Sequence, residues 1–284
     1  MRSMRFRLFA GGVVAAALVL TSAPASVSAA SSTSSVGAVA GANDFSCRPG
    51  TAHPFPVVLV HGTFGNASNF AVLSPQLAAA GFCVFALNYG CQNMQQLVCA
   101  TGPIEESAGQ LSSFVDRVLA ATGAARVDIV GHSQGGMMPR YYLKFLGGTA
   151  RVHRLVGLAP SNHGTTLDGL QNLAAALAGA ADCDACLQQL AGSSFLARLN
   201  AGGDTLLGVQ YTVIETRFDE VVTPFTSAFL SGSAVTNILL QDHCVLDGTG
   251  HVSIVADPNA LGWVRSALDP SVRAPGCTPF LSPL

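Results

Sequence analysis

Ser133 has the sequence context of a catalytic nucleophile. It stands in the run Gly131-His132-Ser133-Gln134-Gly135, after an apolar, β-branched stretch at residues 127–130 and before a helical pattern at residues 136–145. A strand, a serine turn and a helix in this order are typical of a nucleophile elbow, whose strained turn holds the hydroxyl clear of the sheet. Glycines two residues before and after the serine remove the side chains that would block such a turn. The alternative, a glycine-rich turn with a solvated serine, explains neither the strand nor the helix.

A nucleophilic serine requires a histidine base, and His251 is placed to supply it. His251 follows the last predicted strand on a loop rich in Gly and Asp, from which it can reach a serine at the centre of a sheet. Chain position also leaves His163 and His243 open, and His243 is the closer rival. Each of the other histidines has a place elsewhere: His53 before the first strand, His61 beside the loop after that strand, His132 within the elbow, and His153 at the start of a strand.

The acid that orients the base is expected at the end of the penultimate strand. Asp219 follows the apolar run of residues 209–216 and meets this condition. Its carboxylate would accept the Nδ1 proton of the imidazole, fix the tautomer and stabilise the imidazolium that forms during attack. Glu220, the next residue, is the competing acid.

An oxyanion hole requires two backbone N–H groups, one of them directly after the nucleophile. Gln134 supplies that group. Thr63, in the loop after the first predicted strand, supplies the second, or Phe64 does so if the turn is offset by one residue. Gly62 and Gly65 let this loop approach a substrate closely.

These residues must be positioned by strands that alternate with helices. Apolar runs predict six strands, and amphipathic patterns predict helices between them, the clearest at residues 104–122. This alternation predicts an α/β fold with a mostly parallel, doubly wound six-stranded sheet, whose functional groups gather at the carboxyl ends of the strands. The predicted strands are residues 57–60, 82–87, 127–130, 152–158, 209–216 and 235–240.

The segment of residues 163–204 departs from this regular alternation. It carries few charges and a leucine stripe in helical register at Leu167, Leu170, Leu173 and Leu177. Its place after a strand end favours an apolar cap or lid over the site. The alternative is ordinary helical packing against the edge of the sheet.

The N-terminus has the pattern of a secretory signal peptide. Three arginines precede an apolar run at residues 8–20, and small residues follow, so residues 1–29 are predicted to be removed after Ala29, with Ala30 or Ala25 as other cleavage sites. The run is too short for a permanent membrane anchor. Residues 30–46, low in complexity, are predicted to form a flexible leader, and residues 47–284 the folded domain. A secreted, extracellular protein is expected.

Composition narrows the function further. In a chain of 284 residues, 49% hydrophobic and 11% charged, one large core can form. A formal charge of -2 without basic clusters in the domain argues against nucleic acid as a partner. No cofactor and no metal site is expected.

The eight cysteines all lie outside the signal segment, and their even number fits an oxidising compartment. Proximity and order favour structural disulfides over a redox or zinc role for the Cys-x-x-Cys pair. The expected pairs are Cys47 with Cys83, Cys91 with Cys99, Cys183 with Cys186, and Cys244 with Cys277.

Together the motifs resemble secreted bacterial lipases and esterases of the α/β-hydrolase superfamily, and most of all the actinobacterial class 2 triacylglycerol lipases. The resemblance covers about residues 47–277, and rests on residues 61–63, 131–135 and 218–224 with the late His251. The chain order Ser133, Asp219, His251 is that of this superfamily. Cys47 and Cys83 are placed like a disulfide of a fungal lipase in the superfamily. Some related lipases carry a structural calcium, but no acidic cluster here assigns one.

The resemblance and the residues together predict a serine hydrolase of carboxylic esters with medium to long acyl chains. Its partner would be a lipid or ester, also at an oil–water interface, and the protein is expected to be a monomer. A polyester depolymerase or an acyltransferase would use the same triad. A peptidase is disfavoured by the apolar insert, and an inactive binding scaffold by the presence of every catalytic group.

Overall fold

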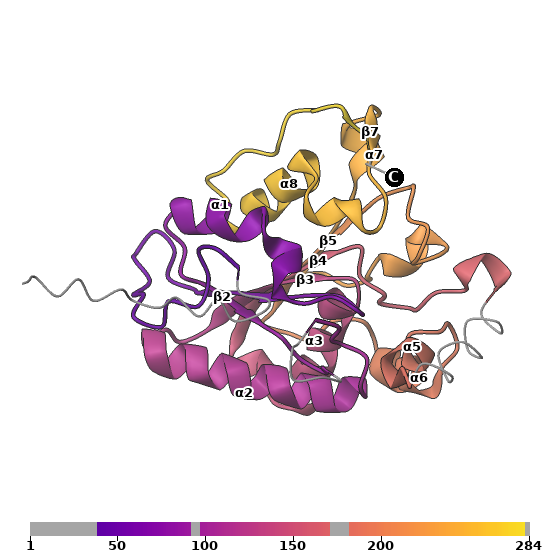
Figure 1. The fold of residues 1–284 in the computed structure, drawn as a ribbon, viewed down its shortest axis with the longest axis horizontal. Helices are drawn as coiled ribbons and strands as arrows, with labels where there is room; N and C mark the ends of the chain where they lie inside the picture. The colour runs from indigo at the N-terminus through magenta and orange to yellow at the C-terminus, as the bar shows by residue number, and fades with distance from the viewer. Residues whose placement is uncertain (1–38, 92–96, 171–181, 282–284) are drawn as a thin grey trace, which may run out of the picture. The chain divides into compact units, whose positions relative to one another are not determined.

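The computed structural model describes residues 39–91, 97–170 and 182–281. Within them a six-stranded sheet has the order β2-β1-β3-β4-β5-β6, and all neighbouring strands are parallel (Figure 1). The predicted α/β class with a mostly parallel six-stranded sheet is confirmed. The strands are β1 Val57–Val60, β2 Val84–Leu87, β3 Val127–His132, β4 Val152–Leu158, β5 Gln210–Glu215 and β6 Val235–Leu239.

Helices cover both faces of the sheet. Alternate strand residues point to opposite faces, so Val58 and Val60 join one apolar core while Val57 and Leu59 join another. The helices α2 and α3 pack into the first core and α1 and α8 into the second, on opposite sides of the sheet in Figure 1. A sheet covered on both faces explains why its strands read as continuous apolar runs. The covering helices are α1 Leu73–Ala79, α2 Ile104–Thr122, α3 Gln134–Phe145 and α8 Pro258–Leu268.

Several predicted boundaries shift by a few residues. Helix α2 has the predicted bounds and ends at Gly123, whose left-handed φ of 74° suits a glycine. The strand predicted from Phe82 begins at Val84. The predicted sixth strand ends at Leu239, because Leu240 begins a short helix, α7 (Leu240–His243).

The predicted flexible leader is wrong for its last residues. Val39 is buried, and Ala42 forms a parallel bridge to Val84 at the outer edge of β2. The side chain of Asn43 donates to the carbonyl oxygen of Ala86 at 2.9 Å and accepts from its N–H at 3.0 Å. The edge strand is therefore paired by residues ahead of Cys47, so residues 39–46 belong to the packed domain. The predicted signal peptide and residues 30–38 lie outside the described residues.

The segment of residues 163–204 contains the short helices α5 (Asp184–Gln188) and α6 (Ser194–Asn200). The buried residues of α6 join the core under α2 and α3. The predicted leucine stripe does not form a helical face at its start. Leu167 and Asp168 have left-handed φ angles of 45° and 51°, and Leu170 is 60% exposed. Leu173 and Leu177 lie outside the described residues.

The cysteines join in four disulfides, the same pairs that the sequence predicts: Cys47–Cys83, Cys91–Cys99, Cys183–Cys186 and Cys244–Cys277. Near the last of these, β7 (Asp247–Gly248) pairs with β8 (Phe280–Leu281). None of the helices in the described part of the chain is long and apolar enough to cross a bilayer.

Candidate active site

Ser133 occupies the sharp turn between β3 and α3. Its φ of 55° and ψ of -122° are strained for a residue with a side chain. A Cβ atom on Gly131 would lie 1.8 Å from the carbonyl oxygen of Gly135, and one on Gly135 would lie 2.1 Å from that of Val60. Only glycine fits at either position, as the elbow pattern predicts.

His251 and Asp219 meet at the carboxyl end of the sheet. Nδ1 of His251 lies 2.8 Å from Oδ2 of Asp219, and both side chains are buried. The other carboxylate oxygen, Oδ1, accepts the N–H groups of Val221 at 2.8 Å and Val222 at 2.6 Å. Burial acts to raise the pKa of Asp219. The hydrogen bond and charge of His251 and the two N–H groups outweigh this effect, so the pKa lies below its ordinary value.

This contact determines which nitrogen of His251 can act as a base. The ionised Asp219 can only accept, so Nδ1 of His251 carries a proton and Nε2 of the neutral ring keeps its lone pair. Ser133 and His251 line the same cavity. The arrangement thus leaves Nε2 as the nitrogen that can take the hydroxyl proton of Ser133.

The rival residues are engaged elsewhere. Glu220 is exposed and accepts the backbone N–H of His251 at 2.9 Å, so it contacts the loop and not the imidazole. His243 is exposed and packs near Trp263, with ring centroids 4.7 Å apart. Both nitrogens of His163 have partners, Ser227 at 2.9 Å and Asp204 at 3.1 Å.

Thr63 and Gln134, the residues predicted for the oxyanion hole, lie next to each other. Oγ1 of Thr63 donates to Oε1 of Gln134 at 2.7 Å. Gln134 is the first residue of α3, where backbone N–H groups have no partner within the helix. A Cβ atom on Gly62 would lie 3.0 Å from Cβ of Ser133, so the loop passes directly beside Ser133. Phe64, the alternative to Thr63, is 55% exposed and also lines the cavity.

Two other buried histidines, His61 and His132, hydrogen-bond to the backbone of the loops around Ser133. Nδ1 of His61 donates to the carbonyl oxygen of Gly62 at 2.9 Å. Nε2 of His132 donates to that of His251 at the same distance. Burial lowers the pKa of His61 to about 4 and, with the nearby charge of His251, that of His132 to about 3. Both rings are therefore neutral at physiological pH. The sequence predicts that both side chains lie near the site, but no pattern in it indicates the hydrogen bond from His132 to the backbone of His251.

The cavity beside Ser133 is lined mainly by apolar atoms. Among the described residues of the 163–204 segment, some form part of its wall, and others pack into the core with α2 and α3. The lining residues are Thr63, Phe64, Gly65, Asn69, His132, Ser133, Ser161, Thr165, Leu167, Cys186, Gln189, Leu190, Val221, Val222, His251 and Val252.

Sequence reasoning missed Glu215, a buried carboxyl group at the end of β5 beside Asp219. Its Oε1 accepts the N–H of Thr216 at 2.8 Å. Burial, followed by the charge of Asp219 and a hydrogen bond to its carboxyl group, raises the pKa of Glu215 well above its ordinary value. The protonated form is favoured because two adjacent carboxylates would repel each other. An unusual glutamate at the end of an apolar strand was the only signal.

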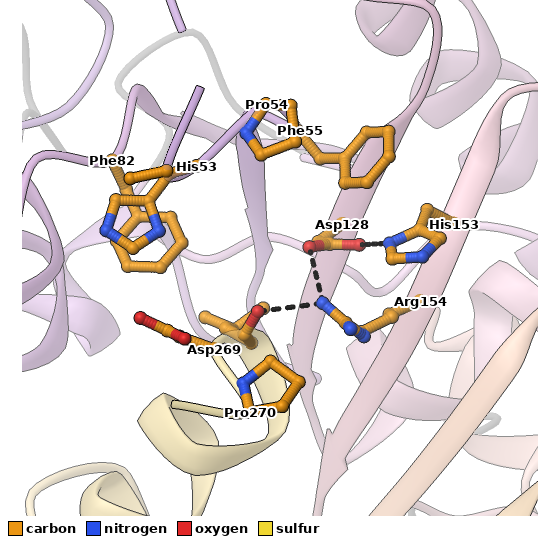
Figure 2. A pocket seen from close by; sticks show the side chains of 11 residues that line it. His53, Pro54, Phe55, Phe82, Asp128, His153, Arg154, Asp269 and Pro270 are labelled. Carbon is orange, nitrogen blue, oxygen red and sulfur yellow. Dashed lines mark hydrogen bonds and ion pairs between the residues drawn. The ribbon is translucent and has the colours of Figure 1, made fainter. Parts of the chain in front are cut away.

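A second hollow lies at the opposite, amino ends of the strands (Figure 2). There the Asp128 carboxylate accepts from Nδ1 of His153 at 2.9 Å and lies 3.7 Å from Nη1 of Arg154. Arg154 also donates to the carbonyl oxygen of Leu268 at 2.7 Å. These polar groups satisfy one another, so they join the sheet to the end of α8. His153 faces away from Ser133, as predicted.

Among the described residues, no group of three or more His, Cys, Asp or Glu side chains converges so as to hold a metal ion.

Comparison with known proteins places the chain among lipases. Residues 54–263, more than half of the chain, match the family described as Lipase (class 2). A triacylglycerol lipase of Vibrio cholerae is 36% identical over 108 residues, which are 38% of this chain and 33% of the relative. A triacylglycerol lipase of Pseudarthrobacter phenanthrenivorans is 36% identical over 93 residues, 31% of this chain and 27% of the relative. The matched part thus spans about a third or less of these relatives.

Solved structures show the same fold. Aspergillus fumigatus lipase B has a TM-score of 0.65 at 22% identity, covering 85% of this chain and 57% of that chain. The mature form of Bacillus licheniformis lipase BlEst2 has a TM-score of 0.59 at 18% identity, covering 78% of this chain and 94% of that chain. At such identities the likeness establishes the fold alone, which is the α/β-hydrolase fold.

Proposed function

We propose, since this chain belongs to the class 2 lipase family, that it hydrolyses carboxylic esters with Ser133 as nucleophile, His251 as base and Asp219 as the acid. The observation that carries the proposal is the 2.8 Å contact between His251 Nδ1 and Asp219 Oδ2 in a cavity that Ser133 also lines. A histidine oriented in this way beside a strained serine has the parts that acyl transfer requires.

The reaction would proceed in two halves. In the first, Oγ of Ser133 attacks the ester carbonyl carbon while Nε2 of His251 takes the hydroxyl proton, and Asp219 stabilises the imidazolium. The N–H groups of Thr63 and Gln134 would bind the oxyanion. The C–O bond to the alcohol then breaks as His251 returns the proton to the alcohol oxygen. In the second half, water attacks the acyl-enzyme with the same proton transfers and releases the acid.

The apolar wall of the cavity supports the proposal that the site binds the acyl chain of the substrate. Leu167, Leu190, Val222 and Val252 line it, and its lining within the described chain includes no Asp, Glu, Lys or Arg. Such a wall offers nothing to a charged peptide side chain and favours hydrocarbon. We therefore propose esters of medium to long acyl chains as substrates.

The proposal includes export and a single catalytic domain. Residues 1–29 would be removed as a signal peptide, and residues 163–204 would serve as a cap. The four disulfides support an oxidising compartment. The partner would be a lipid or ester, met by a secreted monomer without a membrane anchor.

A fluorophosphonate probe, which reacts with activated serines, tests the catalytic assignment. The purified protein should be labelled at Ser133 and should hydrolyse p-nitrophenyl esters, whereas Ser133→Ala should lose both properties. Peptide mapping of the labelled protein identifies the modified serine. Labelling at a different serine, or ester hydrolysis by Ser133→Ala, would contradict the proposed mechanism.

A further inference from the structure

Gln189, directly after α5, places a buried amide group beside the proposed oxyanion hole. Its side chain is only 8% exposed and lines the same cavity as Ser133. Its Nε2 donates to the carbonyl oxygen of Ala185 at 3.0 Å and to Oγ1 of Thr63 at 2.9 Å, and lies 3.2 Å from Oε1 of Gln134. Its Oε1 accepts from Oγ of Ser161 at 2.8 Å. Both N–H groups of this amide and its carbonyl oxygen therefore have partners.

The orientation of the amide is fixed by chemistry. A backbone carbonyl can only accept, so the atom beside the oxygen of Ala185 must be the nitrogen of Gln189. One N–H then points to Ala185, and the other to the pair formed by Thr63 and Gln134. The hydroxyl of Thr63 accepts from Gln189 and donates to Gln134, which sets the direction of each bond in the triangle.

The triangle joins three separate segments. Thr63 belongs to the loop after β1, Gln134 begins α3, and Gln189 directly follows α5. Thr63 and Gln134 are the residues whose backbone N–H groups we assign to the oxyanion. We propose that Gln189 is a positioning residue for the reaction, because it holds these two residues in the arrangement that binds the oxyanion. The inference rests on the proposed function.

Gln189 can hold this position because the chain around it is anchored. A helix as short as α5 has little stability by itself. Cys183 and Cys186 form a disulfide across its first turn, and the N–H of Ala185 donates to the carbonyl oxygen of Thr101 at 3.1 Å. The carbonyl oxygen of Gln189 accepts the N–H of Thr165 at 3.0 Å. Residues 183–189 are thus expected to complete the catalytic geometry as well as to line the site.

The test compares Gln189→Leu with the wild type on p-nitrophenyl butyrate. Loss of the amide leaves Thr63 and Gln134 without their shared donor. We expect kcat to fall on the order of 10- to 100-fold with little change in KM, because the oxyanion forms only in the transition state. The affinity for an alkylboronic acid, whose tetrahedral adduct on serine resembles that state, should fall by a similar factor.

Gln188→Leu is the matched control. Gln188 accepts the N–H of Ile104 at 2.7 Å and donates to Glu105 at 2.6 Å, so it anchors the same helix, but it does not line the cavity. The Gln188→Leu variant should have a Tm about as low as that of Gln189→Leu, while its kcat should stay near the wild-type value. An equal fall of kcat in both variants would show that only the stability of α5 matters and would overturn the inference.

Gln189→Glu gives a readout that a purely structural role would not change. An ionised carboxylate cannot donate to Thr63 or Gln134, whereas the protonated acid restores one donor. The ratio of kcat for this variant to that of the wild type should therefore rise as the pH falls. The titratable groups that share the cavity, His132 and His251, are present in both proteins, so the wild-type pH profile serves as the reference for the variant.

A ratio that is independent of pH, or a Gln189→Leu variant with wild-type kcat, would overturn the inference while leaving the proposed function intact. A wild-type protein that hydrolyses no ester would overturn both.

Discussion

His132 donates a hydrogen bond from Nε2 to the backbone carbonyl oxygen of His251 at 2.9 Å, and the two rings lie with centroids 4.9 Å apart. The bond connects the residue before the proposed nucleophile, Ser133, to the residue proposed as the base. Burial lowers the pKa of His132 to about 3, so the ring is neutral at physiological pH, and its one proton is on Nε2 because the carbonyl oxygen can only accept. The turn that carries Ser133 and the loop that carries His251 therefore hold each other in place.

We expect His132→Leu to lower kcat by about ten-fold, because the loop that carries His251 loses its connection to the elbow. His132→Gln, whose amide can still donate to the carbonyl oxygen of His251, should retain most of the activity. Ester hydrolysis and the rate of fluorophosphonate labelling measure the effect in both variants. Equal losses in the two variants would mean that the volume of the ring, and not its hydrogen bond, is what matters.

Asp219→Asn and Glu220→Gln should have very different effects. Asparagine can present an N–H to His251 and favour the wrong tautomer, so Asp219→Asn should lower kcat by up to about 10⁴-fold. Glu220→Gln keeps an oxygen that can accept the backbone N–H of His251, so its kcat should stay near that of the wild type. The pair is matched because each change removes one negative charge near the same histidine. Comparable losses of kcat would show that Asp219 is not the acid of the triad.

The features that could be predicted from the sequence are those encoded locally. The six strands follow from apolar runs, and the elbow follows from Gly131 and Gly135, whose close backbone contacts admit no side chain. Asp219 and His251 could be proposed as acid and base because the carboxyl ends of parallel strands meet at one edge of a sheet, which limits the candidates to residues just after strands. Local patterns and the position of strand ends in a parallel sheet were therefore enough to name Ser133, Asp219 and His251 as candidates, and the structure brings the Asp219 carboxylate to the His251 ring and places Ser133 and His251 on one cavity.

The features that escaped prediction depend on contacts between distant segments. The triangle of Gln189 with Thr63 and Gln134 joins three such segments, and no single one carries its pattern. The prediction that the leucine stripe forms a helical face is wrong at the start of the stripe, because Leu167 and Asp168 have left-handed backbone conformations that interrupt a helix. The sequence assigned Asn43 to a flexible leader. In the structure Asn43 pairs with the edge of β2 through its side-chain amide, and such a contact leaves no periodic pattern of apolar residues in the sequence.

The buried pair of Asp257 and Asp247 predicts a pH-dependent stability. Burial, followed by a hydrogen bond to Asp247 and its negative charge, raises the pKa of Asp257 from 3.8 to about 7. Between these values the folded protein binds a proton that the unfolded chain releases. The free energy of unfolding should therefore fall as the pH rises from about 4 to about 7, by at most about 1.4 kcal/mol per pH unit from this group.

Asp257→Asn should remove this dependence and keep the cap of α8, because an amide oxygen can still accept the N–H groups of Asn259 and Ala260. Urea denaturation at pH 5 and pH 8 measures the free energy of unfolding of both proteins. The stability of the variant relative to that of the wild type should be greater at pH 8 than at pH 5. Parallel changes in the two proteins would show that another group controls the pH dependence.

The apolar wall of the cavity predicts a preference for longer acyl chains. Each buried methylene contributes about 0.8 kcal/mol of transfer free energy, which corresponds to about four-fold in kcat/KM where the transition state retains the contact. We therefore expect kcat/KM to rise from acetyl through butyryl to octanoyl p-nitrophenyl esters. A wild-type protein that is fastest on acetyl esters would instead be a short-chain esterase.

Leu190 and Leu187 allow this preference to be assigned to the cavity wall. Leu190 lines the cavity, whereas Leu187, on the same short segment, is 37% exposed and does not line it. Leu190→Ser should flatten the rise with chain length because it replaces apolar wall with a hydroxyl, while acetyl ester hydrolysis should change little since an acetyl group does not extend along the wall. Leu187→Ser should keep the full rise. If both variants keep the chain-length profile of the wild type, the acyl chain lies along another wall of the cavity, such as that formed by Val221 and Val222 beside Asp219.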